Sequence, residues 1–192
     1  MNAFVPRPQV HTWSEAIGND PETHRSAITR LIRDQRRLSK FVEENAASMT
    51  GATGGIAVYL IGVILRMFDL AGGRLRNVTW EDVRACEQQV GKLVDQLLPV
   101  DDGFVARARA VQRAQPHMLD EALYALFERD PQDGEPALDD AESFKIYLLM
   151  WVATEALDRN WTPPKAFDGV ADYAFTPVEA TPAPSQDASA ST

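Results

Sequence analysis

The sequence predicts an all-α protein, a single-domain bundle of about six helices around one apolar helix. The first observation behind this prediction is the segment at 54–73, GGIAVYLIGVILRMFDLAGG, which carries no charge before Arg66. A helix that is apolar on every side is either a core helix or a membrane span. Arg66 and Asp69 interrupt the apolar run before the roughly 20 residues that a span needs. We therefore expect residues 56–71 to form the buried central helix of a soluble domain.

The second observation is helical periodicity through most of the chain, without the strict alternation that marks a half-buried strand. Residues 140–159 form the other strongly apolar segment, and Asp139 with Glu142 makes a capping box at its start. We expect this helix to pack directly against the central one. With 192 residues, 45% of them hydrophobic and 24% charged, the chain is within the range of one globular domain.

The N-terminal part begins with residues 1–20, whose prolines, glycine and Asn-Asp pair predict an irregular arm. Asp20 and Pro21 then form a helix start, with Asp20 as the N-cap. Apolar side chains at helical spacing predict one long helix over 21–49. The glycine-rich 50–55, TGATGG, predicts a break before the central helix. It matches neither the P-loop nor the dinucleotide-binding pattern.

Three more helices are expected between the two apolar ones. Thr79 and Asp82 give a capping-box start to a helix that ends before Pro99. Shorter helices follow at about 101–114 and 116–129, and an acidic loop precedes the second apolar helix. The helical domain thus spans 21–161.

The chain ends in a segment of different composition. Residues 162–192 hold five of the 12 prolines, and no large apolar side chain follows Val178. Such a segment cannot bury enough surface to offset the entropy lost on ordering. We expect a flexible, disordered Pro/Ala/Ser-rich tail.

Composition also limits the functions to consider. A net charge of −9 argues against nucleic-acid binding, which needs a basic footprint, and against attraction to anionic lipid. The single cysteine, Cys86, excludes an internal disulfide and a multi-cysteine zinc site. Together with the lack of a recognisable secretory signal, this predicts a cytoplasmic protein.

One face of the expected helix at 21–49 is basic. Between Arg25 and Lys40 lie six positive residues and one acid, Asp34. One interpretation is a docking surface for an acidic partner or for phosphate groups. The other is a solvated helix face, compensated in part by the acidic segment 128–142. The candidate partner-binding residues are Arg30, Arg33, Arg37 and Lys40.

Patterns for catalysis or metal binding are weak. The Glu-x-x-His pairs of di-iron bundles are absent. His117 with Asp120 and Glu121 could supply one face of a metal site, but a histidine in a first helical turn is commonly just exposed. Cys86 falls on an apolar helix face, where a thiol behaves as a small core residue. The sequence therefore predicts no catalytic residue, no metal and no cofactor.

Arg66 and Asp69 are the most informative charged pair. Three residues apart on a helix, they can meet on one face, and a charge on a central helix needs a partner if it is buried. Either the end of this helix reaches solvent, or the pair lines a pocket. In the second case Arg66, Asp69 and Tyr147 are the expected polar groups of that pocket.

These observations favour a soluble helical protein-interaction module, such as an adaptor, an immunity-type inhibitor or an assembly component. Its partner would be another protein, with an acidic one as an option and a homo-oligomer as a further one. The alternative is a small-molecule-binding or enzymatic bundle with a pocket near the central helix. A helix-turn-helix regulator would have to use Arg107, Arg109 and Arg113, and its proline-broken turn fits poorly.

Overall fold

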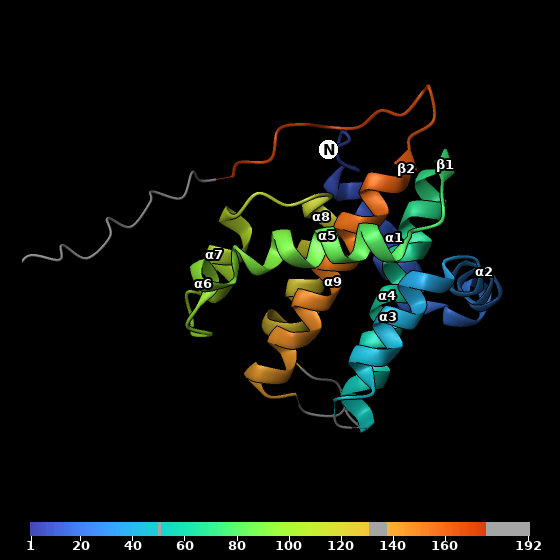
Figure 1. Ribbon diagram of the computed structural model, residues 1–192. Coiled ribbons are helices and arrows are strands. Elements are labelled where there is room, and N and C mark those ends of the chain that lie inside the picture. Colours follow the sequence, from blue (N-terminus) through green and yellow to red (C-terminus); the bar gives the residue numbers. More distant parts are fainter. Residues whose placement is uncertain (50, 131–137, 176–192) are drawn as a thin grey trace, which may run out of the picture.

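The computed structural model describes residues 1–49, 51–130 and 138–175. These residues form an all-α bundle, as the sequence predicts, with two two-residue strands pairing in antiparallel fashion at one end (Figure 1). The elements are α1 (Arg7–Asn19), α2 (Pro21–Asp34), α3 (Arg36–Ala46), α4 (Gly51–Ala71), β1 (Arg74–Leu75), α5 (Trp80–Gly91), α6 (Val94–Leu97), α7 (Phe104–Ala110), α8 (Pro116–Leu123), the π-helical turn η1 (Tyr124–Glu128), α9 (Asp140–Asn160) and β2 (Trp161–Thr162).

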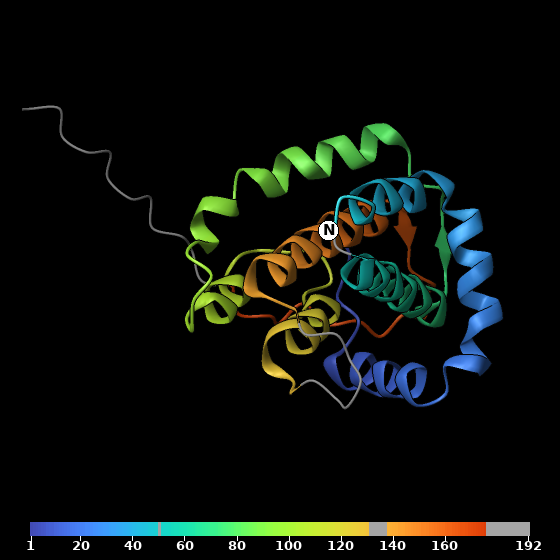
Figure 2. The ribbon, with the colours of Figure 1, turned by 90° about the horizontal axis from the view of Figure 1, so that it is seen from below.

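Helix α4 is the centre of the bundle. Figure 2 shows it almost end-on, with α1, α2, α3 and α9 around it. Its second half is buried in the shared core, including Ile61, Leu65 and Phe68. The expected pairing of α4 with the apolar α9 is confirmed. By length and composition alone α4 could cross a membrane; here it packs inside the helical bundle.

Helix α4 begins at Gly51, so the prediction of a glycine-rich break over 50–55 is wrong for residues 51–55. The reason is close packing against α3. A Cβ atom on Gly54 would lie 2.8 Å from the carbonyl oxygen of Ala46. Glycine lowers helix propensity by about 1 kcal/mol, but at Gly54 only glycine lets the two helices approach this closely.

The long helix predicted over 21–49 is divided into α2 and α3 at Gln35, which has φ −89° and ψ 47°. Gln35 is only 3% exposed. Its Nε2 donates to the carbonyl of Arg76 at 3.0 Å, and its Oε1 accepts from the amide of Val78 at 2.9 Å. A buried amide needs such partners. The side chain of Gln35 therefore anchors the segment after β1.

The N-terminal segment also differs from the predicted irregular arm, because residues 7–19 form α1. Pro6 is its N-cap residue and Pro8 lies in its first turn, where a missing N–H costs nothing. The prolines thus start this helix. Val10 and Ile17 are buried and attach it to the core. The cap at Asp20 is confirmed, since its carboxylate accepts from the amide of Thr23 at 3.3 Å.

In the middle of the chain the helix expected to run up to Pro99 is divided into α5 and α6, while α7 and α8 follow the predicted order. The capping box of Thr79 and Asp82 is present. After β2, residues 163–175 run back over the N-terminal segment (Figure 1). The rest of the predicted tail, residues 176–192, lies outside the described part of the chain.

Candidate functional site

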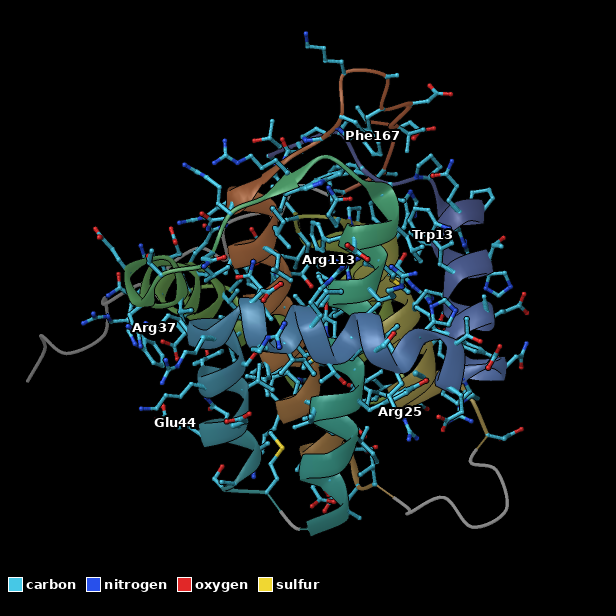
Figure 3. All side chains as sticks on the ribbon, turned by 90° about the vertical axis from the view of Figure 1, so that its right-hand side faces the viewer. Trp13, Arg25, Arg37, Glu44, Arg113 and Phe167 are labelled. Carbon is cyan, nitrogen blue, oxygen red and sulfur yellow. The ribbon has the colours of Figure 1, made fainter. Side chains whose placement is uncertain are left out.

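The predicted partner-binding residues lie on the outer side of α2 and α3. Arg33 and Lys40 form exposed ion pairs with neighbours on their own helices, at 3.8 Å to Asp34 and 3.5 Å to Glu44. Exposed pairs of this kind contribute little to stability. Figure 3 shows the labelled Arg37 at the outer surface, near the start of α3. These side chains are therefore available to a partner.

Two acidic residues of the segment 128–142, which could compensate the basic face, have partners elsewhere in the described part of the chain. Glu128 pairs with Arg109 at 2.6 Å. The Asp139 carboxylate caps α9 by accepting from the amide of Glu142 at 2.7 Å. Residues 131–137 lie outside the described part of the chain.

A groove opens beside the basic face, between the C-terminal ends of α2 and α4 and strand β1. It has a volume of about 700 Å³. Its apolar lining residues are Leu31, Phe68 and Leu75, and its charged ones are Arg30, Arg33, Asp34, Arg36 and Asp69. We call this feature the basic groove.

The anchor at Gln35 brings the chain after β1 to the groove. Because Gln35 holds the backbone of residues 76–78 against the α2–α3 junction, Leu75 and Asn77 join Arg36 in the groove lining, while Arg37, Arg74 and Arg76 are exposed next to these positions in the sequence. Among the described residues these four arginines form no ion pair. In a chain with a net charge of −9, they make a local region of positive potential.

Arg66 and Asp69 form the expected ion pair, with their side chains 20% and 25% exposed. Arg66 Nε also donates to His24 Nδ1 at 3.2 Å, and Arg30 binds the second carboxylate oxygen of Asp69 at 3.2 Å. The pair lies at the partly solvated end of α4. Of the three expected pocket residues, Asp69 lines the basic groove.

Tyr147 lies elsewhere, fully buried on α9, where its hydroxyl accepts from Arg113 Nη1 at 3.1 Å. Arg113 itself is 0% exposed, and Figure 3 shows it in the interior. Its Nη2 donates to Asp120 Oδ1 at 3.0 Å and to the hydroxyl of Tyr173 at 2.9 Å. A buried charge persists only with such partners. The helix-turn-helix alternative would need Arg113 exposed on a recognition helix, which its burial excludes.

The two phenols around Arg113 stay protonated at neutral pH. Burial raises the pKa of Tyr147, and the nearby Arg113 only partly opposes this. Burial also raises the pKa of Tyr173, to about 12. The Tyr173 hydroxyl can therefore accept from Arg113 and at the same time donate to Asp120 Oδ2, which lies 2.7 Å away.

Two buried carboxylates of α9 extend this polar interior. Glu155 accepts from the amide of Ala114 at 2.8 Å and from Trp151 Nε1 at 3.1 Å. Burial raises its pKa, against the effect of these hydrogen bonds. Asp158 accepts from Gln115 Nε2 at 2.8 Å. Trp151 lies one turn before Glu155 on α9, but Ala114 and Gln115 precede α8, so no local pattern marks the two carboxylates as buried.

The chemistry of Gln115 explains how the N-terminal segment is held. It adopts the left-handed conformation, with φ 42°. Its Oε1 accepts from the amide of Val5 at 2.9 Å, and its Nε2 also donates to the carbonyl of Ala3 at 3.1 Å. The side chain that could cap α8 thus binds the N-terminal segment instead.

His117 is the candidate metal ligand of the sequence, and Cys86 is the candidate nucleophile. The described ranges contain no group of three or more histidine, cysteine, aspartate or glutamate side chains placed to hold a metal ion. Burial lowers the pKa of His117, whose ring lies beside that of Tyr173. Burial raises the pKa of Cys86 to about 11, so its thiol is protonated and a poor nucleophile at neutral pH.

The remaining arginines of the helix-turn-helix alternative are engaged within the chain. Arg107 pairs with Asp101 at 2.7 Å, and Arg109 with Glu128. Comparison with known proteins assigns no family: no protein-family model, curated protein or solved structure matches this chain.

Proposed function

We propose that this protein is an interaction module that binds an acidic segment of a partner protein in the basic groove. The observation that supports this most is the lining of the groove, where Arg30, Arg33 and Arg36 come together around apolar side chains. The anchoring of residues 76–78 by Gln35 brings Leu75 and Asn77 into the same lining. The result is a positive rim around an apolar floor.

The chemistry of the rim suits carboxylates. An arginine guanidinium offers a planar fork of donors that binds a carboxylate through two parallel hydrogen bonds. The floor, with the half-buried Leu75, offers apolar contact for a side chain between the acidic ones. Because the chain is acidic as a whole, repulsion elsewhere would orient an acidic partner toward this face. The same repulsion disfavours nucleic acid, whose binding depends on a broad basic footprint.

The test is a fluorescence-polarisation titration with a labelled peptide of glutamates around one phenylalanine. The groove variant Arg33→Glu/Arg36→Glu/Arg37→Glu reverses three exposed charges at the rim. The matched control Arg84→Glu/Lys92→Glu/Lys145→Glu makes the same change in net charge at exposed positions of α5, its C-terminal turn and α9. We expect the groove variant to bind at least about tenfold more weakly and the control to bind nearly as the parent does.

Arg30 is left out of this variant because it pairs with Asp69, and its reversal would place two carboxylates together. Equal weakening in both variants would mean that only net charge matters, and would contradict a site at the groove. Tighter binding of a DNA oligonucleotide than of the peptide would contradict an acidic protein as the partner.

A second candidate is a small-molecule site in the same groove. Its volume of about 700 Å³ is within the range of ligand pockets, and Asp69 with the half-buried Leu75 gives it a polar and an apolar wall. A ligand of the native state must raise the melting temperature. Stabilisation by a metabolite that Leu75→Ala abolishes would favour this candidate over the peptide site.

A further inference from the structure

Residues 163–175, which we call the strap, lie on the surface of the bundle. Each of them is half-buried or exposed, in contrast to the core helices. The strap is joined to the N-terminal segment by one antiparallel bridge. The amide of Phe4 donates to the carbonyl of Val170 at 2.6 Å, and the amide of Val170 donates to the carbonyl of Phe4 at 2.9 Å. Figure 1 shows the strap passing over the N-terminus.

Tyr173 is the part of the strap that reaches the buried charge. Its hydroxyl accepts from Arg113 and donates to Asp120, at 2.9 Å and 2.7 Å. Its ring centroid lies 5.7 Å from Arg113 Cζ and 5.2 Å from the ring of His117. A guanidinium above an aromatic ring is a favourable cation–π contact. These three residues therefore recognise both parts of a phenol, the ring and the hydroxyl.

We propose that Arg113, Asp120 and His117 form a socket for a phenol, and that Tyr173 fills it as a detachable plug. The strap leaves the body as one unit while the helices stay folded. The open socket then binds an aromatic ring that carries a hydroxyl. This inference is independent of the basic groove, which lies on other elements.

The strap can leave because none of its side chains is fully buried. Opening breaks the two hydrogen bonds of the bridge, the two of the Tyr173 hydroxyl, and the ring contacts of Phe167 with Trp161 and of Phe175 with Phe4. It also returns water to Arg113, whose burial carries a desolvation penalty. Segments with few buried contacts and exposed hydrogen bonds are those that open locally in native proteins.

The layer under the strap remains in place when it opens. Asn2 Nδ2 donates to the carbonyls of Asp158 and Trp161, at 2.8 Å and 3.0 Å. The amide of Val5 is bound by Gln115. The N-terminal segment is thus attached to α8 and α9 without the strap.

Space for the ring to move already exists. A cavity of about 390 Å³ adjoins the socket and is lined by Arg7, Arg109, His117, Asp120 and Tyr173. A ring that leaves the guanidinium of Arg113 can enter this cavity without displacing a helix.

Hydrogen exchange of the full chain tests the detachable plug. We expect the amide of Val170 to exchange much faster than that of Met150 in α9. Low concentrations of denaturant should not raise the exchange rate at Val170, as is typical of a local opening. Tyr173→Phe removes only the hydroxyl and should speed exchange at Val170 about tenfold without changing α9. Tyr124→Phe, at an exposed tyrosine, is the control. The proposal is overturned if Val170 exchanges only with the slowest helical amides, or if Tyr173→Phe accelerates all amides alike.

The socket itself is tested with p-cresol and toluene, which differ by the hydroxyl. Tyr173→Ala empties the socket, so millimolar p-cresol should raise its melting temperature and toluene should have little effect. With the parent chain, p-cresol should speed exchange at Val170 by competing with Tyr173, a readout that does not depend on the folding of the alanine variant. An equal response to both compounds, or no response to p-cresol in either measurement, would rule out a phenol socket. The groove variant should respond as the parent does, which separates this test from that of the groove.

Discussion

The side chain of Gln35 binds the backbone of Arg76 across 41 positions of sequence, with Nε2 donating to the carbonyl oxygen at 3.0 Å. Its Oε1 accepts from the amide of Val78. One buried amide thus ends α2, starts α3 and determines where the chain after β1 lies. The positions of Leu75 and Asn77 in the lining of the basic groove depend on this contact.

Replacing Gln35 should therefore destabilise the fold and the groove together. Gln35→Leu leaves the carbonyl of Arg76 and the amide of Val78 without a partner, and we expect a loss of about 2–4 kcal/mol. Urea unfolding measures this loss. The exposed Gln88→Leu is the control and should stay within about 0.5 kcal/mol of the parent. A similar small change for Gln35→Leu would show that water replaces these hydrogen bonds.

Two glycines one position apart on α4 should respond in opposite ways to alanine. A Cβ at Gly54 would meet the carbonyl oxygen of Ala46 at 2.8 Å, whereas a Cβ at Gly55 has nothing within 4 Å. Gly54→Ala should destabilise the protein by about 1–2 kcal/mol because α3 must move. Gly55→Ala should stabilise it by about 0.5–1 kcal/mol through helix propensity. Thermal unfolding distinguishes the two variants. If both substitutions raised the melting temperature, α3 would be able to move away from residue 54 without loss of stability.

Glu155 should make stability depend on pH in a defined direction. Because burial raises its pKa in the folded protein above the ordinary value, the folded state holds the proton more tightly than the unfolded state does. Its contribution is then fully present below the unfolded pKa and is lost as pH rises through the folded pKa. Glu155→Gln removes this titration, so the variant should gain stability relative to the parent as pH rises above the ordinary glutamate value of 4.5.

The measurement is the difference in unfolding free energy between Glu155→Gln and the parent at each pH. Other titrating groups largely cancel in that difference. Glu87→Gln, which removes an exposed carboxylate from α5, should show a smaller trend. A difference for Glu155→Gln that is flat with pH would contradict the raised pKa.

Asp120 should be essential to the burial of Arg113. Asp120→Asn keeps the shape but removes the charge opposite a guanidinium that is 0% exposed. Since breaking a buried pair leaves an uncompensated charge, we expect a loss of about 2–3 kcal/mol. Asp102→Asn, at an exposed position, should cost far less. Chemical denaturation compares the two variants, and equal effects would show that Tyr147 and Tyr173 satisfy Arg113 by themselves.

The features that sequence reasoning predicted correctly rest on near neighbours or on apolar content. The caps at Asp20, Thr79 and Asp139 join residues three apart, so a short stretch of sequence contains both partners. The two apolar helices follow from composition, because an apolar helix has to lie in a core. The all-α class and the pairing of α4 with α9 follow from these signals.

The features that only the tertiary structure decided depend on contacts between residues that are far apart in the sequence. Gln35 ends a helix by bonding to residues more than 40 positions away. Arg113 is buried with partners for both of its terminal nitrogens, one of them Tyr173, 60 positions away. Gly54 is explained by a carbonyl oxygen on another helix. A local sequence pattern specifies whether a segment forms a helix, because the hydrogen bonds of a helix join residues within one turn. Whether a polar side chain is buried depends on which partners the rest of the chain places beside it. For Gln35 in the groove and Arg113 in the socket, those partners come from distant parts of the sequence.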